Sequence, residues 1–182
     1  MGQHFLYYDR FPHSKDFDYY TIDSIRNNKN YLTNESKKVI ADYDNATKYN
    51  DYVVSMIINQ YIKKNAIILY LSDHGEEVFD YTDRRGRVLE DPIPTQAMKY
   101  QFEIPFFIWC SDIYMQKYPK IVSRIKATIN TPFSIDNLCH ILFHIGQIET
   151  NYYKPERDLL SPSYKCPPRV IEGTTLFRKS KK

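Results

Sequence analysis

The pattern of hydrophobic and polar positions predicts a long helix followed by two short buried strands. Apolar residues between positions 49 and 61 recur at intervals of three and four, with polar residues between them. This spacing is typical of an amphipathic helix, which we expect to run from about residue 41 to the lysines at 63 and 64. Continuous apolar runs follow at residues 66–71 and 103–111. Short runs of this kind favour parallel strands that are buried on both faces.

The second half of the chain returns to a helical pattern. Residues 111–130 have helical periodicity, with Ser111 or Asp112 as the candidate N-cap, and residues 134–146 predict a short helix that Gly146 ends. Residues 1–40, 72–100 and 147–182 are rich in polar and turn-forming residues, and we expect them to be mostly irregular. The order helix, strand, loop, strand, helix predicts a single layered α/β domain.

Composition and charge narrow the class of protein. The 182 residues are 42% hydrophobic and 15% aromatic, which excludes a disordered chain. The net charge is only +3 and basic residues are mixed with acidic ones, so we expect no nucleic-acid partner. No apolar run reaches the ~18 residues of a transmembrane helix, and we expect neither such a helix nor a signal peptide in these residues. Three widely spaced cysteines, Cys110, Cys139 and Cys166, leave open whether a disulfide forms.

The strongest candidate for chemistry is the polar sequence directly after the first predicted strand. Asp73 and His74 lie at its carboxyl end, where ligands gather in open α/β sheets. Zinc accepts a carboxylate and an imidazole together, at about 2.0–2.2 Å for both. Glu76 can be a further ligand or an acceptor that orients the His74 ring. The alternative interpretation is an ordinary strand-to-loop boundary with solvated polar residues.

Two ligands do not make a tight zinc site, which needs three or four, so other residues must contribute. His4 lies in a polar loop and is the best further candidate, whereas we expect His13 to be exposed. His140 and His144 have the i, i+4 spacing of ligands on a helix, but their apolar neighbours favour a structural role. No nucleophile motif such as G-x-S-x-G or a P-loop is present.

Four segments together resemble the phosphoethanolamine transferases of lipid A and the lipopolysaccharide core, in the sulfatase-like branch of the alkaline phosphatase superfamily. They stand in the family's order within about residues 1–145 and read "MGQHFLYYDRFP", "YDNATKYNDYVVSMII", "ILYLSDHGEE" and "IPFFIWCS". The resemblance implies an α/β fold, a three-layer α/β/α sandwich with a mostly parallel sheet. Residues 1–182 would be the C-terminal portion of this catalytic domain, with 147–182 as an irregular C-terminal tail packed on it.

The resemblance also implies roles for individual residues. Asp73 and His74 would be ligands of the catalytic zinc, and His4 would contact the substrate phosphate or a second zinc. Family members often carry another histidine beyond this motif, but here the corresponding sequence is "DRRGRV". A second zinc or substrate site is therefore left open, or is built from other groups such as Arg84, Arg85 or Arg87.

The activity implied by the resemblance is that of a membrane-anchored enzyme at the periplasmic face of the bacterial inner membrane. A zinc-activated threonine takes phosphoethanolamine from a phospholipid donor, and the phosphothreonine passes it to a lipopolysaccharide acceptor. In the family, the membrane domain, a zinc-binding acid and this threonine precede the segments matched here. We therefore expect no catalytic nucleophile in residues 1–182 and no activity from this chain by itself.

Two other functional classes stay open at this point. A sulfatase or phosphodiesterase of the same superfamily also carries an Asp-His pair after a strand, so the pair alone does not separate hydrolysis from transfer. A non-catalytic remnant or interaction domain would keep the fold without the chemistry.

Overall fold

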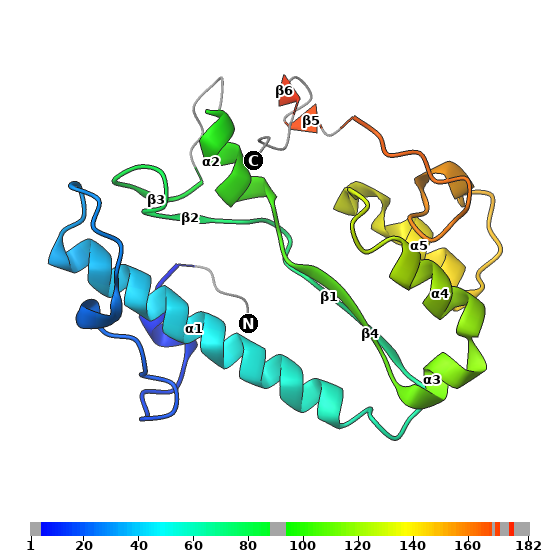
Figure 1. Ribbon diagram of the computed structural model, residues 1–182, viewed down its shortest axis with the longest axis horizontal. Helices are drawn as coiled ribbons and strands as arrows, with labels where there is room; N and C mark the ends of the chain where they lie inside the picture. Colours follow the sequence, from blue (N-terminus) through cyan, green and yellow to red (C-terminus); the bar gives the residue numbers. More distant parts are fainter. Residues whose placement is uncertain (1–4, 88–93, 169, 172–174, 177–182) are drawn as a thin grey trace. The chain divides into compact units, whose positions relative to one another are not determined.

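The computed structural model of the chain describes residues 5–87, 94–168, 170–171 and 175–176 (Figure 1). The chain folds as two compact units, which are described one after the other. Unit 1 comprises Met1–Tyr61 and His74–Phe106, and unit 2 comprises Ile62–Asp73 and Phe107–Lys182.

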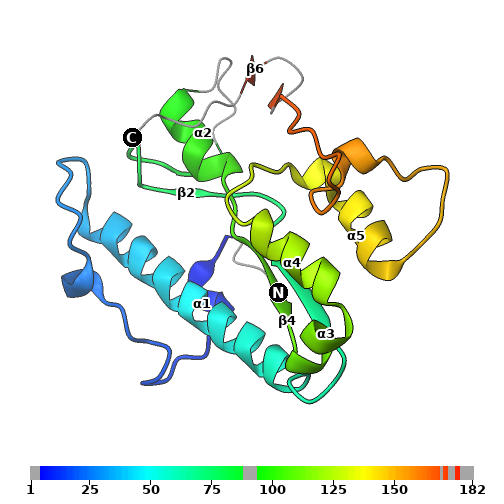
Figure 2. The same ribbon diagram turned by 45° about the vertical axis from the view of Figure 1, so that its right-hand side comes forward.

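Unit 1 is built on the long helix α1, Asn34–Asn59. Its start is fixed by a capping box, in which the Thr33 hydroxyl accepts from the Ser36 amide and the Ser36 hydroxyl accepts from the Thr33 amide. The predicted start near residue 41 was therefore wrong, because the cap rather than the apolar spacing decides where the helix begins. The short 3₁₀ helices η1, Tyr7–Arg10, and η2, Ile22–Ser24, lie against α1 (Figure 2).

The remainder of unit 1 is a small hairpin and a second helix. Strands β2, Glu77–Val78, and β3, Arg85–Gly86, pair antiparallel, and helix α2 spans Thr95–Phe102. We had expected residues 72–100 to be irregular throughout, and these elements correct that expectation. Strands of two residues are too short to show the alternation by which a strand is recognised.

Unit 2 contains most of a two-stranded sheet of β1, Ile67–Leu71, and β4, Phe106–Cys110. Both strands lie where the apolar runs predicted them. However, the Ser111 amide after β4 donates to the Ala66 carbonyl before β1 at 3.0 Å, so the two strands run antiparallel. The sequence had predicted parallel strands buried on both faces, whereas β1 is half-buried throughout. A continuous apolar run indicates that a strand is buried, but it does not tell whether the neighbouring strand runs parallel or antiparallel to it.

The second half of unit 2 is helical and loop-rich. Helices α3, Asp112–Lys117, and α4, Pro119–Ala127, replace the single helix predicted over 111–130, because Pro119 lacks an N–H and starts a new helix. Ser111 caps α3, accepting from the Tyr114 amide at 3.1 Å. The turn η3, Ile135–Asn137, leads into α5, Leu138–Gly146, which ends at the predicted glycine.

The segment after α5 holds the turn η4, Pro155–Arg157, and the antiparallel pair β5, Val170–Ile171, and β6, Thr175–Leu176. All three strand pairs of the described residues are thus antiparallel, and the mostly parallel sheet is not present among them. The assignment of residues 147–182 as an irregular tail stays a prediction.

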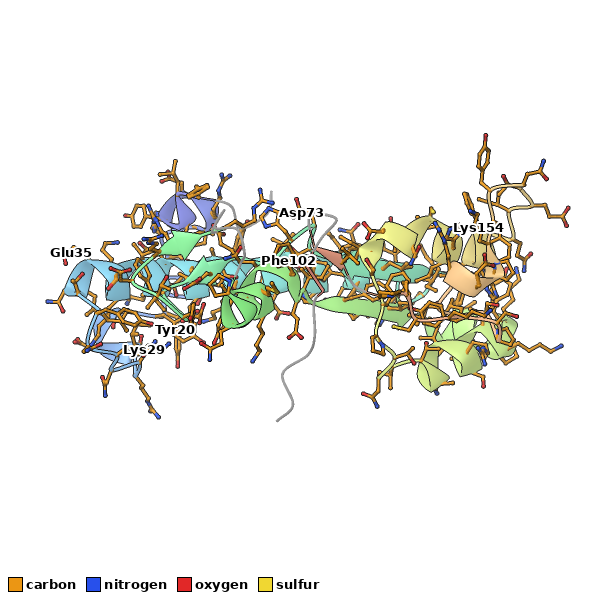
Figure 3. The ribbon with its side chains drawn as sticks, turned by 90° about the horizontal axis from the view of Figure 1, so that it is seen from above. Tyr20, Lys29, Glu35, Asp73, Phe102 and Lys154 are labelled. Carbon is orange, nitrogen blue, oxygen red and sulfur yellow. The ribbon has the colours of Figure 1, made fainter. Side chains whose placement is uncertain are left out.

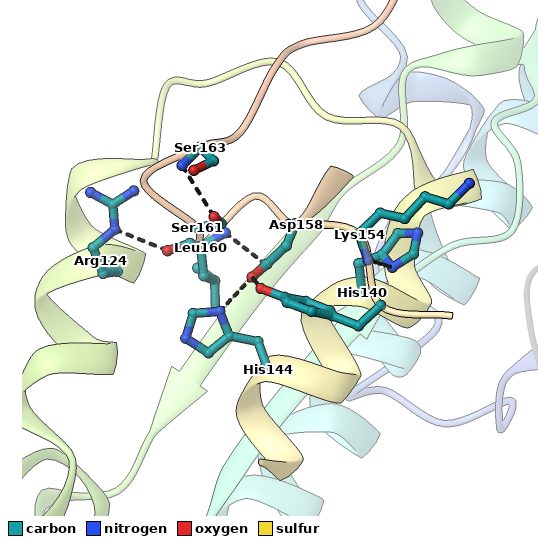
Figure 4. Close-up of polar contacts among 9 residues, drawn as sticks. Arg124, His140, His144, Lys154, Asp158, Leu160, Ser161 and Ser163 are labelled. Carbon is teal, nitrogen blue, oxygen red and sulfur yellow. Dashed lines mark hydrogen bonds and ion pairs between the residues drawn. The ribbon is translucent and has the colours of Figure 1, made fainter. Parts of the chain in front are cut away.

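A buried carboxylate joins α5 to the segment that follows it (Figure 4). Asp158 is fully buried; it contacts His144 Nδ1 and accepts from the Tyr153 hydroxyl at 2.8 Å. His140 is also buried, and its Nδ1 accepts from the Lys154 amide at 3.3 Å. Both histidines are therefore engaged within the fold, in agreement with the structural role that their apolar neighbours favoured.

Two expectations concern membranes and disulfides. Across the described ranges, no helix combines the length and the apolarity that crossing a bilayer requires. The three cysteines, Cys110, Cys139 and Cys166, are free thiols.

Candidate metal centre

Asp73 and His74 lie just past the carboxyl end of β1, after Ser72, as the sequence predicted. Asp73 is exposed (Figure 3) and His74 is half-buried. His74 Nδ1 lies 2.8 Å from the Gly75 carbonyl oxygen. A carbonyl can only accept, so Nδ1 is the donor in this contact. A ligating histidine is ordinarily held in this way, with one ring nitrogen donating to an acceptor while the other is the one that can bind a metal.

Gly75 is required by the packing of the main chain behind His74. A Cβ atom at this position would lie 2.2 Å from the Tyr100 carbonyl oxygen, far inside van der Waals contact. The Gly75 amide donates to the Gln101 carbonyl at 2.9 Å, in the last turn of α2. Helix α2, which the sequence had not predicted, therefore fixes the turn that places the His74 ring.

Glu77 organises the loop beyond the pair. It is fully buried, and its Oε1 accepts from the Tyr81 amide at 3.1 Å and from the Thr82 amide and hydroxyl at 2.6 and 3.0 Å. The Asp80 carboxylate accepts from the Val78 amide at 3.0 Å. The sequence pattern did not reveal this role for Glu77. The only hint in the sequence was that a second acidic residue follows Glu76, and an exposed glutamate at this position would give the same pattern.

Glu76 points into the interior of unit 1 beside Tyr7. Its Oε2 and the Tyr7 hydroxyl are both buried, and a hydrogen bond between the two side chains is among the causes of the raised pKa of Tyr7. Burial, followed by the charge of Glu76, raises the pKa of Tyr7, so the phenol stays protonated. The Arg85 guanidinium lies 5.9 Å from the Tyr7 ring centroid.

The other candidate residues are not gathered into a complete site. Among the described residues, no group of three or more His, Cys, Asp or Glu could hold a metal ion. His4 lies outside the described residues. His13 is exposed, as expected, and stacks on Tyr8 with ring centroids 3.9 Å apart. The three arginines of the 83–88 segment are also exposed, namely Arg84, Arg85 and Arg87.

Comparison with known proteins decides the family. The family model described as Sulfatase matches residues 1–147 of this chain. The chain belongs to the sulfatase family.

This sulfatase-family chain is similar to named transferases. It is 30% identical over 174 residues to phosphoethanolamine transferase EptC of Escherichia coli (strain K12), covering 94% of the chain and 28% of that protein. It is also 30% identical over 161 residues to phosphoethanolamine transferase EptA of Salmonella typhimurium (strain LT2), covering 86% of the chain and 28% of that protein. The chain thus spans little more than a quarter of the length of these relatives.

Solved structures of the E. coli EptC C-terminal periplasmic domain match the fold. One crystal structure has a TM-score of 0.78 at 29% identity and covers 93% of this chain and 46% of that domain. A crystal structure of the same domain in complex with Zn has a TM-score of 0.76 at 26% identity, covering 97% and 48%. The sulfatase-family chain therefore corresponds to about half of a solved periplasmic domain.

Proposed function

We propose that the chain is part of the catalytic domain of a zinc-dependent phosphoethanolamine transferase that modifies lipid A or the lipopolysaccharide core. The observation that carries the proposal is His74, which follows Asp73 just past the end of β1 and whose ring is held through Nδ1 by the Gly75 carbonyl. The names of the similar relatives support the transferase class. In this proposal the complete domain is a three-layer α/β/α sandwich with a mostly parallel sheet. It acts at the periplasmic face of the bacterial inner membrane on a phospholipid donor and a lipopolysaccharide acceptor.

Asp73 and His74 are the residues of this chain that would hold the zinc. Exposed carboxylate oxygens and an imidazole lone pair are donors that zinc accepts, and the remaining ligands would come from the other half of the domain. When bound, zinc supplies a Lewis acid that lowers the pKa of a hydroxyl nucleophile and neutralises phosphoryl charge. His4 would contact the substrate phosphate. A second zinc site stays open in this proposal.

The test is a zinc titration of the chain by calorimetry, compared with Asp73→Asn and His74→Ala. Both substitutions should weaken binding by about tenfold or more, because each removes a ligand and the effect of removing an orienting partner alone is already ~10-fold. His13→Ala is the matched control, since His13 is exposed and stacked on Tyr8. Equal zinc affinity in all four proteins would instead favour a non-catalytic remnant domain.

Hydrolysis is the second candidate, because the family model that matches is described as Sulfatase. A sulfatase or phosphodiesterase would pass the substrate to water rather than to lipopolysaccharide. Assays of a protein that contains the complete domain, with phosphatidylethanolamine and with sulfate esters, separate the two classes. Release of sulfate without transfer of phosphoethanolamine would support the hydrolase.

A further inference from the structure

The β2–β3 hairpin carries a basic patch on its second strand. Arg84, Arg85 and Arg87 are all exposed, and Asp83 is the only acid among residues 83–87. The net charge of this segment is +2, because three arginines outweigh one aspartate. We call residues 83–87 the arginine patch. The proposed function leaves the role of the patch open, and a concentration of guanidinium groups favours the binding of anions.

The pairing of β2 with β3 brings one end of the patch to the residues that follow His74. Glu77 pairs with Gly86, and the two strands are antiparallel (Figure 1). The next residue after β3, Arg87, therefore lies opposite Glu76, which is two positions after His74. The side chains agree with this register, since a Cβ atom at Gly86 would lie 4.0 Å from Glu76 Oε1. All of these residues belong to unit 1.

The other end of the hairpin is fixed by contacts to its main chain. The Phe79 amide donates to the Arg84 carbonyl at 3.0 Å, and the Phe79 carbonyl accepts from the Tyr31 hydroxyl at 3.2 Å. Phe79 has a φ of 60°, a left-handed conformation that a bulky residue adopts only where its surroundings enforce it. The Lys29 ammonium donates to the Asp80 carbonyl. The arginine patch therefore stands on a main chain that is held in place.

The three arginines differ in what they contact. The Arg85 guanidinium lies 5.9 Å from the centroid of the Tyr7 ring, in a cation–π contact. Arg84 lies at the end of the hairpin that is farther from His74. Arg87 forms no ion pair, side-chain hydrogen bond or ring contact within the described part of the chain. Its N–H donors can therefore bind a ligand, at the end of the patch that is nearest to His74.

We propose that Arg87 binds the phosphate group of the phosphoethanolamine donor beside the metal site. This inference rests on the proposed function, which assigns zinc to Asp73 and His74 and names the class of substrate. A phosphoryl group has oxygens beyond those that a metal contacts, and the guanidinium fork can donate two parallel hydrogen bonds to them. Arg87 orients the phosphate and neutralises part of its charge.

Nuclear magnetic resonance measures this binding directly on the metal-free chain. The probe is glycerophosphoethanolamine, the water-soluble headgroup of the lipid donor, added to the isotope-labelled chain at low salt, because salt screens exposed charges. The signals of the Arg87 side chain should shift as the ligand binds. Arg87→Gln should weaken binding by about tenfold or more, the effect of losing a hydrogen bond to a charged group. Arg87→Lys keeps the charge but loses the fork, so its affinity should lie between the other two.

Arg84→Gln is the matched control, because it removes the same charge from the same hairpin at the end that is farther from His74. It should leave the affinity nearly unchanged. Both positions are exposed, so both variants should fold, and circular dichroism during heating checks this. The shift of the Arg87 signals in the wild-type chain needs no variant at all.

Two results would overturn the proposal. The first is an affinity of Arg87→Gln equal to that of the wild-type chain, or no shift of the Arg87 signals at millimolar ligand. The second is equal weakening by Arg84→Gln and Arg87→Gln, which would show that only the net charge of the patch acts. The zinc titration is a separate measurement. Binding that depends on Arg87 in a chain without zinc affinity would contradict the metal site and support the arginine, and zinc binding without a role for Arg87 would do the reverse.

Discussion

At the scale of single residues, the candidate centre depends on main-chain geometry more than on the metal-binding side chains themselves. His74 is oriented by the carbonyl of its own neighbour Gly75, 2.8 Å from Nδ1. Gly75 can hold that position only because it has no Cβ to meet the Tyr100 carbonyl. The position of the His74 ring therefore depends on the glycine that follows it and on the packing of α2 behind that glycine.

Gly75→Ala should destabilise the fold by about 1–3 kcal/mol, the usual range for forcing a carbon into a packed site. The new Cβ would meet a main-chain oxygen at 2.2 Å, and the turn must shift and carry the His74 ring with it. Urea denaturation and zinc titration measure the two effects. Gly146→Ala is the control, because its Cβ meets only the flexible Ile148 side chain at 3.2 Å, and it should cost less. A stable Gly75→Ala variant with unchanged zinc affinity would contradict this account.

At the scale of elements, α1 organises unit 1 through polar groups on its buried side. Asn45 is fully buried, and its Oδ1 accepts from the amides of Tyr19 and Tyr20 at 3.0 and 2.7 Å. One side chain thus ties the N-terminal segment to the helix. Asp44, one residue earlier, is half-buried, and burial followed by the charge of Asp80 raises its pKa. The carboxylate form of Asp44 therefore opposes the packing of α1 near the β2–β3 loop.

The raised pKa of Asp44 gives a pH dependence with a defined sign. The pKa of Asp44 in the folded protein lies above its unfolded value of about 3.9. Protonation of Asp44 therefore stabilises the fold fully at pH values below about 3.9, and this stabilisation is lost as the pH rises through the folded pKa. Asp44→Asn mimics the protonated form, so it should raise Tm at pH 7 and change it little near pH 4. Asp51→Asn, an exposed position on the same helix, is the control. Equal Tm changes at both pH values would show that the Asp44 charge is not responsible.

At the scale of the whole molecule, the described residues hold only part of the proposed metal site. Two candidate ligands lie at the end of β1, and no larger group of metal ligands is present among the described residues. The chain covers about half of the solved EptC periplasmic domains.

The zinc-loaded chain should therefore hydrolyse a phosphodiester such as bis-p-nitrophenyl phosphate no faster than zinc in buffer. The proposed site has only two ligands from this chain, Asp73 and His74, and the sequence contains no nucleophile motif. Release of p-nitrophenolate above the protein-free rate is the measurement, with His74→Ala as the comparison. Turnover that the wild-type chain has and His74→Ala lacks would show that these residues suffice for catalysis.

The sequence by itself determined the features that depend on near neighbours. The apolar run before Asp73 and His74 is strand β1, Ser111 caps α3, and the four motif segments led to the family that the comparison confirmed. The start of α1, the β2–β3 hairpin and α2 also depend on neighbouring residues, but the sequence analysis did not recognise them. The first turns of α1 and helix α2 have too few apolar residues to show a helical pattern, and the hairpin strands are too short to show alternation.

Only the tertiary structure decided the rest. The direction of β4 against β1, the contact of Gly75 with Tyr100 and the burial of Glu77 depend on segments that meet in space but not in sequence. A run of residues specifies its own secondary structure through spacing and capping, whereas its partners are chosen by how all the apolar surfaces of the chain are buried together. For this reason the sequence could identify the two candidate ligands, while the fold was needed to show how His74 is held.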